Sequence, residues 1–229
     1  ESRFPKGSVG KAEVKKNVAI IGAGPAGLEA AYIAGQRGHS VTVYEASDRL
    51  CGGQLRMASS SPCKDILQHV PEFFKVQLER MDNVEIKLNT PVTESNVGDL
   101  NADYVLLATG ATPLVLPIPG IEKAKIAQDV LLHKAEVSGN VVICGGGQVG
   151  VETALELLER GHKVSIVEML PDLILKEELM TRIVMMKKLA DAEVPVYCRH
   201  KVSRFTDGAV EIEDMQTGEY LYNTEAADL

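Results

Sequence analysis

Hydrophobic and polar positions follow the same order in two segments of the chain, residues 17–45 and 140–168. Each segment opens with an apolar run rich in β-branched residues and continues through a glycine-rich turn into a helical pattern. That pattern ends at Arg-Gly-His, and a second alternating run follows it. This order predicts a strand, a helix and a second strand. Because a crossover helix joins parallel strands, each segment is expected to form part of a parallel sheet.

The two segments are similar to one another along their whole length. An offset of 123 residues aligns them without gaps and gives 13 identities in 29 positions. Similarity kept in register over that length indicates a duplicated supersecondary unit rather than chance. The pattern therefore predicts an α/β fold with two Rossmann-like dinucleotide-binding domains.

Both copies carry the motif Gly-x-Gly-x-x-Gly at the turn from strand to helix. Its glycines are Gly22, Gly24 and Gly27 in the first copy and Gly145, Gly147 and Gly150 in the second. The first glycine allows a tight turn, the second allows the backbone to approach a pyrophosphate, and the third allows close packing of helix on strand. The start of the helix then offers free amide groups to the phosphates. One such motif is often mere tight packing, but two copies predict two dinucleotide sites.

Each copy ends its second strand in a glutamate, Glu45 or Glu168, which lies 23 residues after the first glycine of the motif. A carboxylate at this position can accept hydrogen bonds from the ribose hydroxyls of an adenine nucleotide. In the second copy it would repel the additional phosphate of NADPH, and no lysine or arginine follows directly in EMLPDLI. We therefore expect NADH to be preferred over NADPH by at least ~10-fold, which corresponds to about 1.4 kcal/mol.

Charge and composition remove several classes of function. The net charge of −8 argues against a basic nucleic-acid binder. The apolar runs are shorter than the roughly 20 residues that a membrane helix needs. The four cysteines, Cys51, Cys63, Cys144 and Cys198, lack the close spacing of metal sites and dithiol redox motifs. We therefore expect a reduced, cytoplasmic chain without a metal site or a membrane span.

Four stretches resemble a known family. VAIIGAGPAGLEAA and VTVYEASDRLCGGQL resemble the FAD-binding start of the flavoprotein reductases with two dinucleotide domains, the pyridine nucleotide-disulfide oxidoreductase-like proteins. GGQLRMASSSPCKDI (52–66) resembles, more specifically, the C-terminal part of the NADH:flavin oxidoreductases of the old yellow enzyme, 2,4-dienoyl-CoA reductase, 2-enoate reductase and trimethylamine dehydrogenase group. DYVLLATGATPLVLPIPG (103–120) resembles the second flavin-binding motif, where the chain leaves the FAD domain for the NAD domain.

The resemblance implies an FAD domain that is interrupted by an NAD domain. We expect a linker at 1–16, the N-terminal part of the FAD domain at 17–112, a second linker at 113–120 and the NAD domain at 121–229. The prolines of the second linker can continue neither a strand nor a helix. The returning strand of the family's FAD domain is not found before Leu229, so we expect this domain to be truncated at its C-terminus.

The resemblance also assigns cofactor-binding positions one by one. The positions for FAD are Gly22, Gly24, Pro25, Ala26, Gly27, Glu45, Arg49, Gly53, Gln54, Val92, Ala108, Thr109 and Gly110. The positions for NAD are Gly145, Gly147, Gln148, Val149, Gly150 and Glu168. Alternatively, Arg49 is a solvated turn residue and Val92 a core residue. Gly146 makes a third consecutive glycine, and we expect it to loosen its turn.

The function that the resemblance implies is that of a flavin-dependent NADH oxidoreductase fragment. It would pass a hydride from NADH to FAD, and the electrons would continue to FMN and a 4Fe–4S cluster in domains upstream of Glu1. No catalytic side chain is expected, because the cofactors carry the chemistry. NADH and those upstream domains are the expected partners, and homo-oligomerisation stays open. We expect the isolated chain to retain FAD weakly or not at all.

Two alternatives stay open. In the first, the groove of the first copy holds only ADP, and the chain is a nucleotide-binding module without chemistry. In the second, the chain belongs to a different FAD reductase, such as the small subunit of glutamate synthase or a thioredoxin reductase. The ASSSPCK run counts against the synthase subunit, and the absence of a Cys-x-x-Cys motif counts against the thioredoxin enzyme.

Several other residues are expected to be structural. We interpret Glu29 and Glu152 as acids in the first helical turn, which compensate the helix dipole. We interpret Met180, Met185 and Met186 as residues that fill the core.

Overall fold

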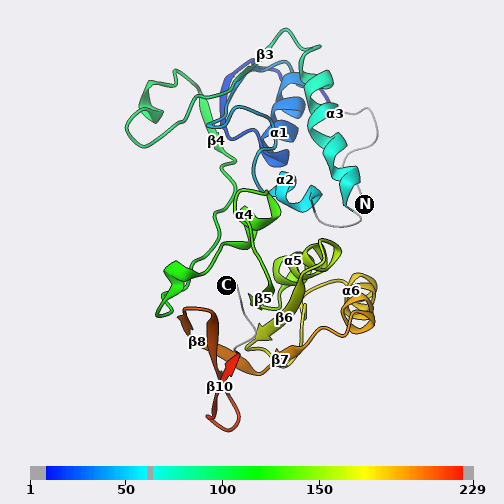
Figure 1. Cartoon of the computed structure of the whole chain (residues 1–229). Helices are drawn as coiled ribbons and strands as arrows, with labels where there is room; N and C mark the ends of the chain where they lie inside the picture. Colours follow the sequence, from blue (N-terminus) through cyan, green and yellow to red (C-terminus); the bar gives the residue numbers. More distant parts are fainter. Residues whose placement is uncertain (1–8, 61–63, 224–229) are drawn as a thin grey trace. The chain divides into compact units, whose positions relative to one another are not determined.

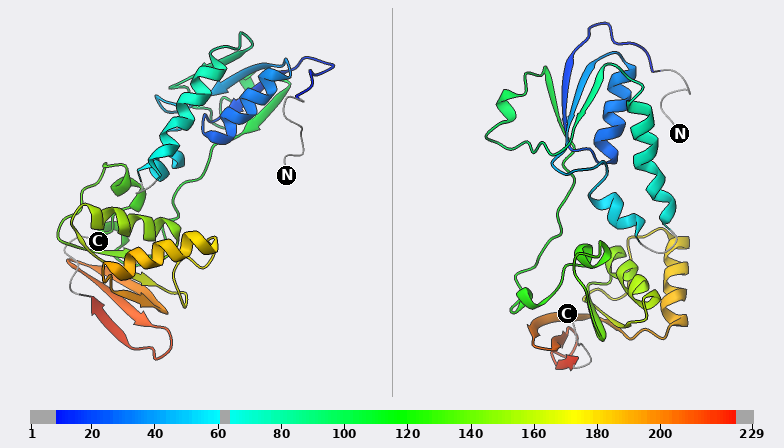
Figure 2. Two further views of the ribbon diagram at one scale, coloured as in Figure 1. Left: turned by 90° about the vertical axis from the view of Figure 1, so that its right-hand side faces the viewer. Right: turned by 45° about the horizontal axis from the view of Figure 1, so that its top comes forward.

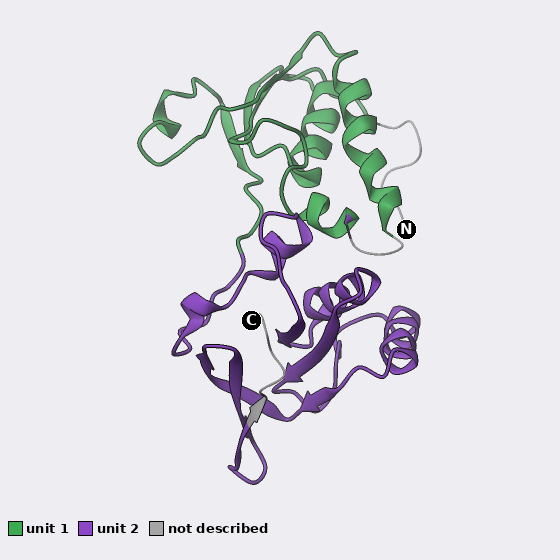
Figure 3. Cartoon of the chain, in the orientation of Figure 1, with its two compact units in different colours: residues 1–59, 64–112 green, residues 60–63, 113–229 purple. Residues whose placement is uncertain are grey.

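The computed structural model describes residues 9–60 and 64–223, and the chain divides into two compact units (Figure 3). The first unit comprises residues 1–59 and 64–112, and the second comprises residues 60–63 and 113–229. Each unit therefore contains one of the two duplicated segments. The Cys63 position lies outside the described residues.

The first unit is built on a parallel sheet of four strands. They are β1 (Asn17–Ile21), β2 (Ser40–Tyr44), β3 (Val84–Lys87) and β4 (Tyr104–Leu107), in the spatial order β3-β2-β1-β4. The pairing of β1 with β2 is parallel and in register from Asn17 and Ser40 onward, as the crossover through a helix predicts.

Two long helices of the first unit lie side by side against this sheet (Figures 1 and 2). They are α1 (Pro25–Gln36) and α3 (His69–Leu78), and the shorter elements are α2 (Gln54–Ser59) and the 3-10 helices η1 (Asp65–Gln68) and η2 (Val97–Asp99). Ile20, Val41 and Val43 of the strands are buried against Leu28 of α1 and Phe74 of α3. This apolar layer fixes the position of α1, and with it the glycine-rich turn that precedes α1.

The second unit contains a parallel and an antiparallel sheet. Strands β5 (Asn140–Cys144), β6 (Lys163–Glu168) and β7 (Val196–Cys198) are parallel, in the order β5-β6-β7. Strands β8 (His200–Thr206), β9 (Ala209–Asp214) and β10 (Tyr220–Asn223) are antiparallel, in the order β10-β9-β8. The helices are α4 (Ala127–Leu131), α5 (Gln148–Glu159), α6 (Leu179–Asp191) and the 3-10 helix η3 (Ile121–Lys123).

Both faces of the parallel sheet in the second unit are buried. Ile143 and Ile166 belong to a core with Val151 of α5. Val142 and Val167 point the other way, into a core with Phe205 and other residues of the antiparallel sheet. Covered on both faces, β5 and β6 are near-continuous apolar runs, which is typical of parallel strands.

Strand β4 differs from the other strands of its sheet because all four of its side chains are exposed. Tyr104 is 63% exposed and Leu107 is 73% exposed. Within the described residues β4 pairs only with β1, so its outer edge carries unpaired backbone groups. Within the described part of the chain, the apolar strand β4 is therefore an edge strand of its sheet.

The methionines near α6 do not all fill the core. Met185 and Met186 pack against the core of the second unit, whereas Met180 is 63% exposed, which corrects the expectation for that residue. Met180 is the second residue of α6, and this end of the helix projects past the core. None of the helices within residues 9–60 and 64–223 combines the length and the hydropathy of a membrane span.

Candidate functional site

The glycine-rich turn of the first unit joins β1 to α1, and two of its glycines are required by packing. Gly22 has a φ of +105°, and a Cβ there would overlap the carbonyl oxygen of Ala108. A Cβ at Gly27 would overlap the carbonyl oxygen of Gly22. At Gly24, by contrast, no described atom lies within 4 Å of an added Cβ. Packing within the protein therefore explains the first and third glycines but leaves open space at the second.

The turn of the second unit, between β5 and α5, repeats this arrangement except at its first glycine, Gly145, where an added Cβ has no described atom within 4 Å. Gly145 has a φ of +112°, and a Cβ at Gly150 would overlap the carbonyl oxygen of Gly145. An added Cβ at Gly147 has no described atom within 4 Å. The middle glycine thus faces open space in both turns.

Gly146 tightens its turn, which corrects the expectation that it loosens the turn. A Cβ at Gly146 would overlap Cδ2 of Leu173 and lie 3.0 Å from Cβ of Glu168. The Gly146 N–H also donates to Glu168 Oε2 at 2.6 Å. The glycine is therefore needed for close approach of the strand-end glutamate and of the loop that follows it.

The two helices that follow the turns begin without a side-chain cap. Gly24 and Gly147 are the N-cap residues of α1 and α5, and within the described chain neither helix has a capping side chain or an acid in its first turn. Helix α6 is different, because the Glu178 carboxylate accepts hydrogen bonds from the amides of Met180 and Thr181. The first amides of α1 and α5 therefore remain available to an anionic ligand.

Glu29 and Glu152 lie outside the first helical turn, contrary to the sequence expectation. The helices begin at Pro25 and Gln148, directly after the second glycine of each motif, so each glutamate is the fifth helical residue. Glu152 is 6% exposed, and its Oε1 accepts a hydrogen bond from Gln148 Nε2 at 3.0 Å. Glu152 thus takes part in a partly buried polar contact and does not compensate the helix dipole.

Glu45 ties the first turn to the loop after β2. Its Oε2 accepts the N–H of Ala23 at 2.7 Å, and its Oε1 accepts the N–H of Ser47 at 2.8 Å. Partial burial opposes ionisation, but these backbone hydrogen bonds outweigh it and hold the pKa of Glu45 below its ordinary value. The carboxylate is therefore ionised at neutral pH and fixed beside the glycine-rich turn.

Glu168 repeats this arrangement in the second unit. Its carboxylate accepts the N–H of Gly146 and, at 2.7 Å, the N–H of Leu170. Glu168 is 8% exposed. Since Ala23, Glu45 and Ser47 align with these residues at the offset of 123, both carboxylates connect the same backbone positions.

The duplication extends beyond the segments that sequence comparison aligns. The N–H of Cys51 donates to the carbonyl of Ala23, and at the same offset the N–H of Ile174 donates to the carbonyl of Gly146. Cys51 and Ile174 are both buried and both have positive φ, +52° and +42°. In this loop the two copies share little sequence beyond a leucine, Leu50 in one and Leu173 in the other. That leucine was the signal that could have revealed the shared loop.

The remaining residues assigned to FAD lie along the carboxyl edge of the first sheet. Ala108, Thr109 and Gly110 directly follow β4, and the backbone of Ala108 packs on the Gly22 turn. Gly53 and Gln54 are exposed, and Gln54 Nε2 donates to the carbonyl of Ala111 at 3.3 Å. Parallel strands end at one edge, so these residues share that edge with Gly22 and Glu45.

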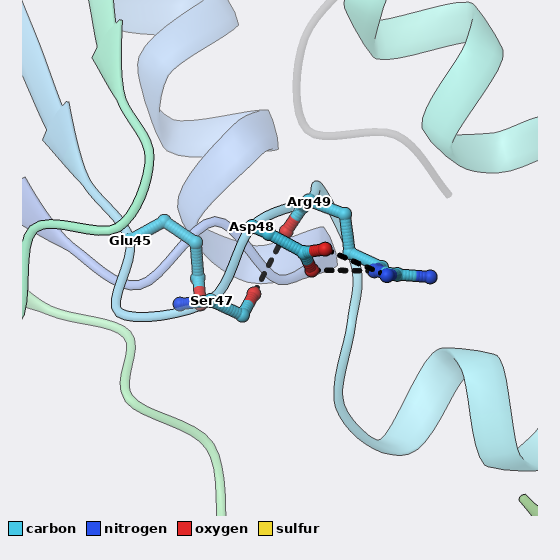
Figure 4. Close-up of polar contacts among 4 residues, drawn as sticks. All are labelled: Glu45, Ser47, Asp48 and Arg49. Carbon is cyan, nitrogen blue, oxygen red and sulfur yellow. Dashed lines mark hydrogen bonds and ion pairs between the residues drawn. The ribbon is translucent and has the colours of Figure 1, made fainter.

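Two assigned residues have an ordinary structural environment. Arg49 forms a two-pronged ion pair with its neighbour Asp48, at 2.6 Å from Nε and 2.7 Å from the terminal nitrogen, and Ser47 Oγ donates to the Arg49 carbonyl (Figure 4). Val92 is half-buried in the loop after β3. In the second unit, the assigned Val149 is exposed in the first turn of α5.

Cys51 lies beside the first turn, where its N–H donates to the Ala23 carbonyl, and its environment keeps the thiol protonated. Burial, and after it the Glu45 carboxylate, raises the pKa of Cys51 to about 11. We expect iodoacetamide at about pH 8 to label Cys51 on the order of 100-fold more slowly in the folded chain than in the urea-unfolded chain, because the thiolate is the reactive form. Peptide mapping by mass spectrometry measures both rates. Equal rates would contradict the burial of this thiol.

Comparison with known proteins shows which family this chain resembles. Residues 16–226 match the family described as pyridine nucleotide-disulphide oxidoreductase. The chain is 41% identical over 184 residues to an NADH oxidase of Thermoanaerobacter brockii, covering 78% of this chain and 28% of that protein. It is 43% identical over 164 residues to a cinnamate reductase of Clostridium sporogenes, covering 72% of this chain and 24% of that protein.

A solved structure of 2-naphthoyl-CoA reductase is also similar, with a TM-score of 0.88 and 27% identity over 96% of this chain and 33% of that chain. The chain thus spans about a quarter to a third of the length of these relatives. The comparisons confirm the resemblance seen in the sequence motifs and the α/β fold of Rossmann-like units. The chain therefore belongs to the pyridine nucleotide-disulphide oxidoreductase family.

Proposed function

We propose that this chain is the dinucleotide-binding part of a flavin-dependent NADH oxidoreductase, with FAD at the first glycine-rich turn and NADH at the second. The observation that carries the proposal is the repeated arrangement of an uncapped helix, an open middle glycine and a turn-bound carboxylate. With both nucleotides bound, NADH would supply a hydride and FAD would be its acceptor, and the turns and carboxylates of this chain would hold and orient the two. FMN and a 4Fe–4S cluster in other domains of a longer chain would then receive the electrons.

The carboxylates have the capacity to bind ribose while they hold their turns. An ionised carboxylate offers about four acceptor positions. Backbone amides use one position on each oxygen of Glu45 and of Glu168. The remaining positions can accept the two hydroxyls of an adenosine ribose. This arrangement suits a ligand that has both hydroxyls free, as the adenosine ribose has in FAD and NADH.

The turns supply the rest of each site. The open space at Gly24 and Gly147 is where a pyrophosphate would approach the backbone, and the amides at the start of α1 and α5 would donate to it. In the first unit, Ala108 to Gly110 would pass beneath the dinucleotide, where larger side chains would block it. The proposed reaction needs no side chain that transfers a proton, because the protein only binds and orients the two nucleotides.

The second site should discriminate between the two nicotinamide cofactors. Glu168 would lie next to the 2′ position of the adenosine ribose, so the 2′-phosphate of NADPH would be repelled by the negative charge of its carboxylate. We expect NADH to bind at least ~10-fold more tightly than NADPH, or by about 1.4 kcal/mol. Fluorescence titration of the purified chain with each cofactor measures this ratio. Equal dissociation constants would contradict the role of Glu168.

The proposed function is tested by the visible absorption spectrum of the purified chain. The spectrum is recorded after incubation with FAD and desalting, and again after anaerobic addition of NADH. A flavin band that loses absorbance with NADH is the result expected wherever flavin is retained, and parallel titrations should detect binding of NADH. Tight binding of ADP without binding of flavin would contradict the proposal and favour a nucleotide-binding module without chemistry.

A further inference from the structure

The order of the strands in the second unit gives a direction to the nucleotide, if the proposed function is correct. The glycine-rich turn follows β5, Glu168 ends β6, and Arg199 follows β7. The strands are parallel and adjacent in the order β5-β6-β7, so the three features lie along one edge. Neighbouring strands are ~4.8 Å apart. A nucleotide with its pyrophosphate at the turn and its ribose at Glu168 would therefore place its adenine at the end of β7.

The backbone of Arg199 is fixed next to the loop that Glu168 holds. Its N–H donates to the Leu170 carbonyl at 3.0 Å, and its own carbonyl accepts the N–H of Met215 at 2.9 Å. The N–H of Leu170 is the group that donates to Glu168. The backbone of Leu170 thus links Arg199 to the Glu168 carboxylate by two hydrogen bonds, although Arg199 and Glu168 are 31 positions apart in the sequence.

The same frame occurs in the first unit with a different side chain. The N–H of Asn89, which follows β3, donates to the carbonyl of Ser47, the counterpart of Leu170. Asn89 and Arg199 both have positive φ, +51° and +60°. Asparagine tolerates this conformation better than most residues, whereas arginine has no such preference. The backbone geometry therefore accounts for the asparagine but not for the arginine.

The charge of Arg199 acts at this edge of the sheet. Burial raises the pKa of the neighbouring Cys198 thiol, Asp172 and Glu168 raise it further, and Arg199 lowers it. The charges of Asp172, Glu168 and Arg199 therefore all lie near this thiol. Among the described residues Asp172 is paired with Arg182, while Arg199 is exposed and forms no ion pair. Its planar cation is available to a ligand.

We propose that Arg199 is a binding residue of the second site and that its guanidinium stacks on the adenine ring. A planar guanidinium binds aromatic faces by stacking and by cation–π attraction, and its fixed charge needs no counter-ion within the protein to do so. Glu168 would select the ribose, and Arg199 would hold the base. A stacking contact involves only the adenine ring, which NADH and NADPH share, so it should increase the affinity for both by the same factor.

The test compares Arg199→Ala with Arg204→Ala, which changes an exposed arginine in β8, by fluorescence titration with NADH and NADPH. We expect Arg199→Ala to raise both dissociation constants by about 5-fold, Arg199→Lys to raise them by less, and Arg204→Ala to change neither. Thermal denaturation of each variant reports whether the fold is kept.

Each other outcome has a distinct meaning. Unchanged binding in Arg199→Ala, with a wild-type chain that binds NADH, would overturn this inference alone. A loss confined to NADPH would also overturn it, because it would mean that Arg199 faces a phosphate. A wild-type chain that binds neither cofactor would overturn the proposed function, and this inference would fail with it.

Discussion

Alanine at Gly150 is expected to destabilise the second unit by about 3 kcal/mol, whereas alanine at Gly147, three residues earlier, leaves its stability within ~1 kcal/mol. The added Cβ at Gly150 would overlap the carbonyl oxygen of Gly145, so α5 would have to move away from β5. At Gly147 the Cβ has no described neighbour within 4 Å, and a φ of −73° suits any residue.

Gly147→Ala, which should leave stability nearly unchanged, is expected to weaken the binding of NADH. If the space at Gly147 belongs to the pyrophosphate, then Gly147→Ala raises the dissociation constant for NADH at least 10-fold, or by about 1.4 kcal/mol, in a chain that is still folded. Urea denaturation and NADH titration of the two variants separate the effects. A stable Gly150→Ala chain, or normal NADH affinity in Gly147→Ala, would contradict the respective half of this prediction.

The corresponding pair in the first unit extends the comparison. Gly27→Ala should lower stability, because its Cβ overlaps the Gly22 carbonyl, while Gly24→Ala should not. Titration with ADP measures the nucleotide affinity of this site without requiring the flavin to be retained. Gly24 is the N-cap and Gly27 lies inside α1, where helix propensity alone would make alanine stabilising, so a loss of stability in Gly27→Ala cannot be an effect of propensity.

The sequence sufficed to predict the strand-turn-helix-strand units, because their signals are local. Periodicity, the glycine spacing and the strand-end glutamates are all read within 29 residues. The parallel pairing of β1 with β2 and of β5 with β6 follows from that order alone. The glycine motif does not determine which glycine is the N-cap, so it does not fix where each helix starts. The prediction that Glu29 and Glu152 lie in the first turn is wrong for this reason.

Contacts between distant residues could not be read in this way. The approach of Arg199 to Leu170 depends on β7 lying next to β6, and inspection of EMLPDLI for a basic residue could not detect it. The role of Gly146 was misjudged for the same reason. Flexibility was inferred from three consecutive glycines, whereas the constraint comes from Leu173, which a later loop brings onto the turn.

The substitution Glu168→Leu is expected to cost about 2–4 kcal/mol of stability, because the amides of Gly146 and Leu170 would lose their acceptor in a buried place. Glu168→Gln keeps one oxygen as an acceptor but brings an NH₂ group against an amide donor, so we expect a smaller loss. Both variants should bind NADH at least 10-fold more weakly than the wild type, and Glu168→Gln should no longer discriminate strongly against NADPH.

Glu45 provides the matched measurement as a function of pH. Its pKa is lowered in the folded chain, so its contribution to stability is complete above its unfolded pKa of ~4.3 and is lost as the pH falls through the lower folded value. The difference in unfolding free energy between the wild type and Glu45→Gln should therefore be constant from about pH 8 to pH 6 and shrink below about pH 4. Urea denaturation across this range measures it. A difference that does not change with pH would show that the Glu45 carboxylate stabilises the turn by its shape and not by its charge.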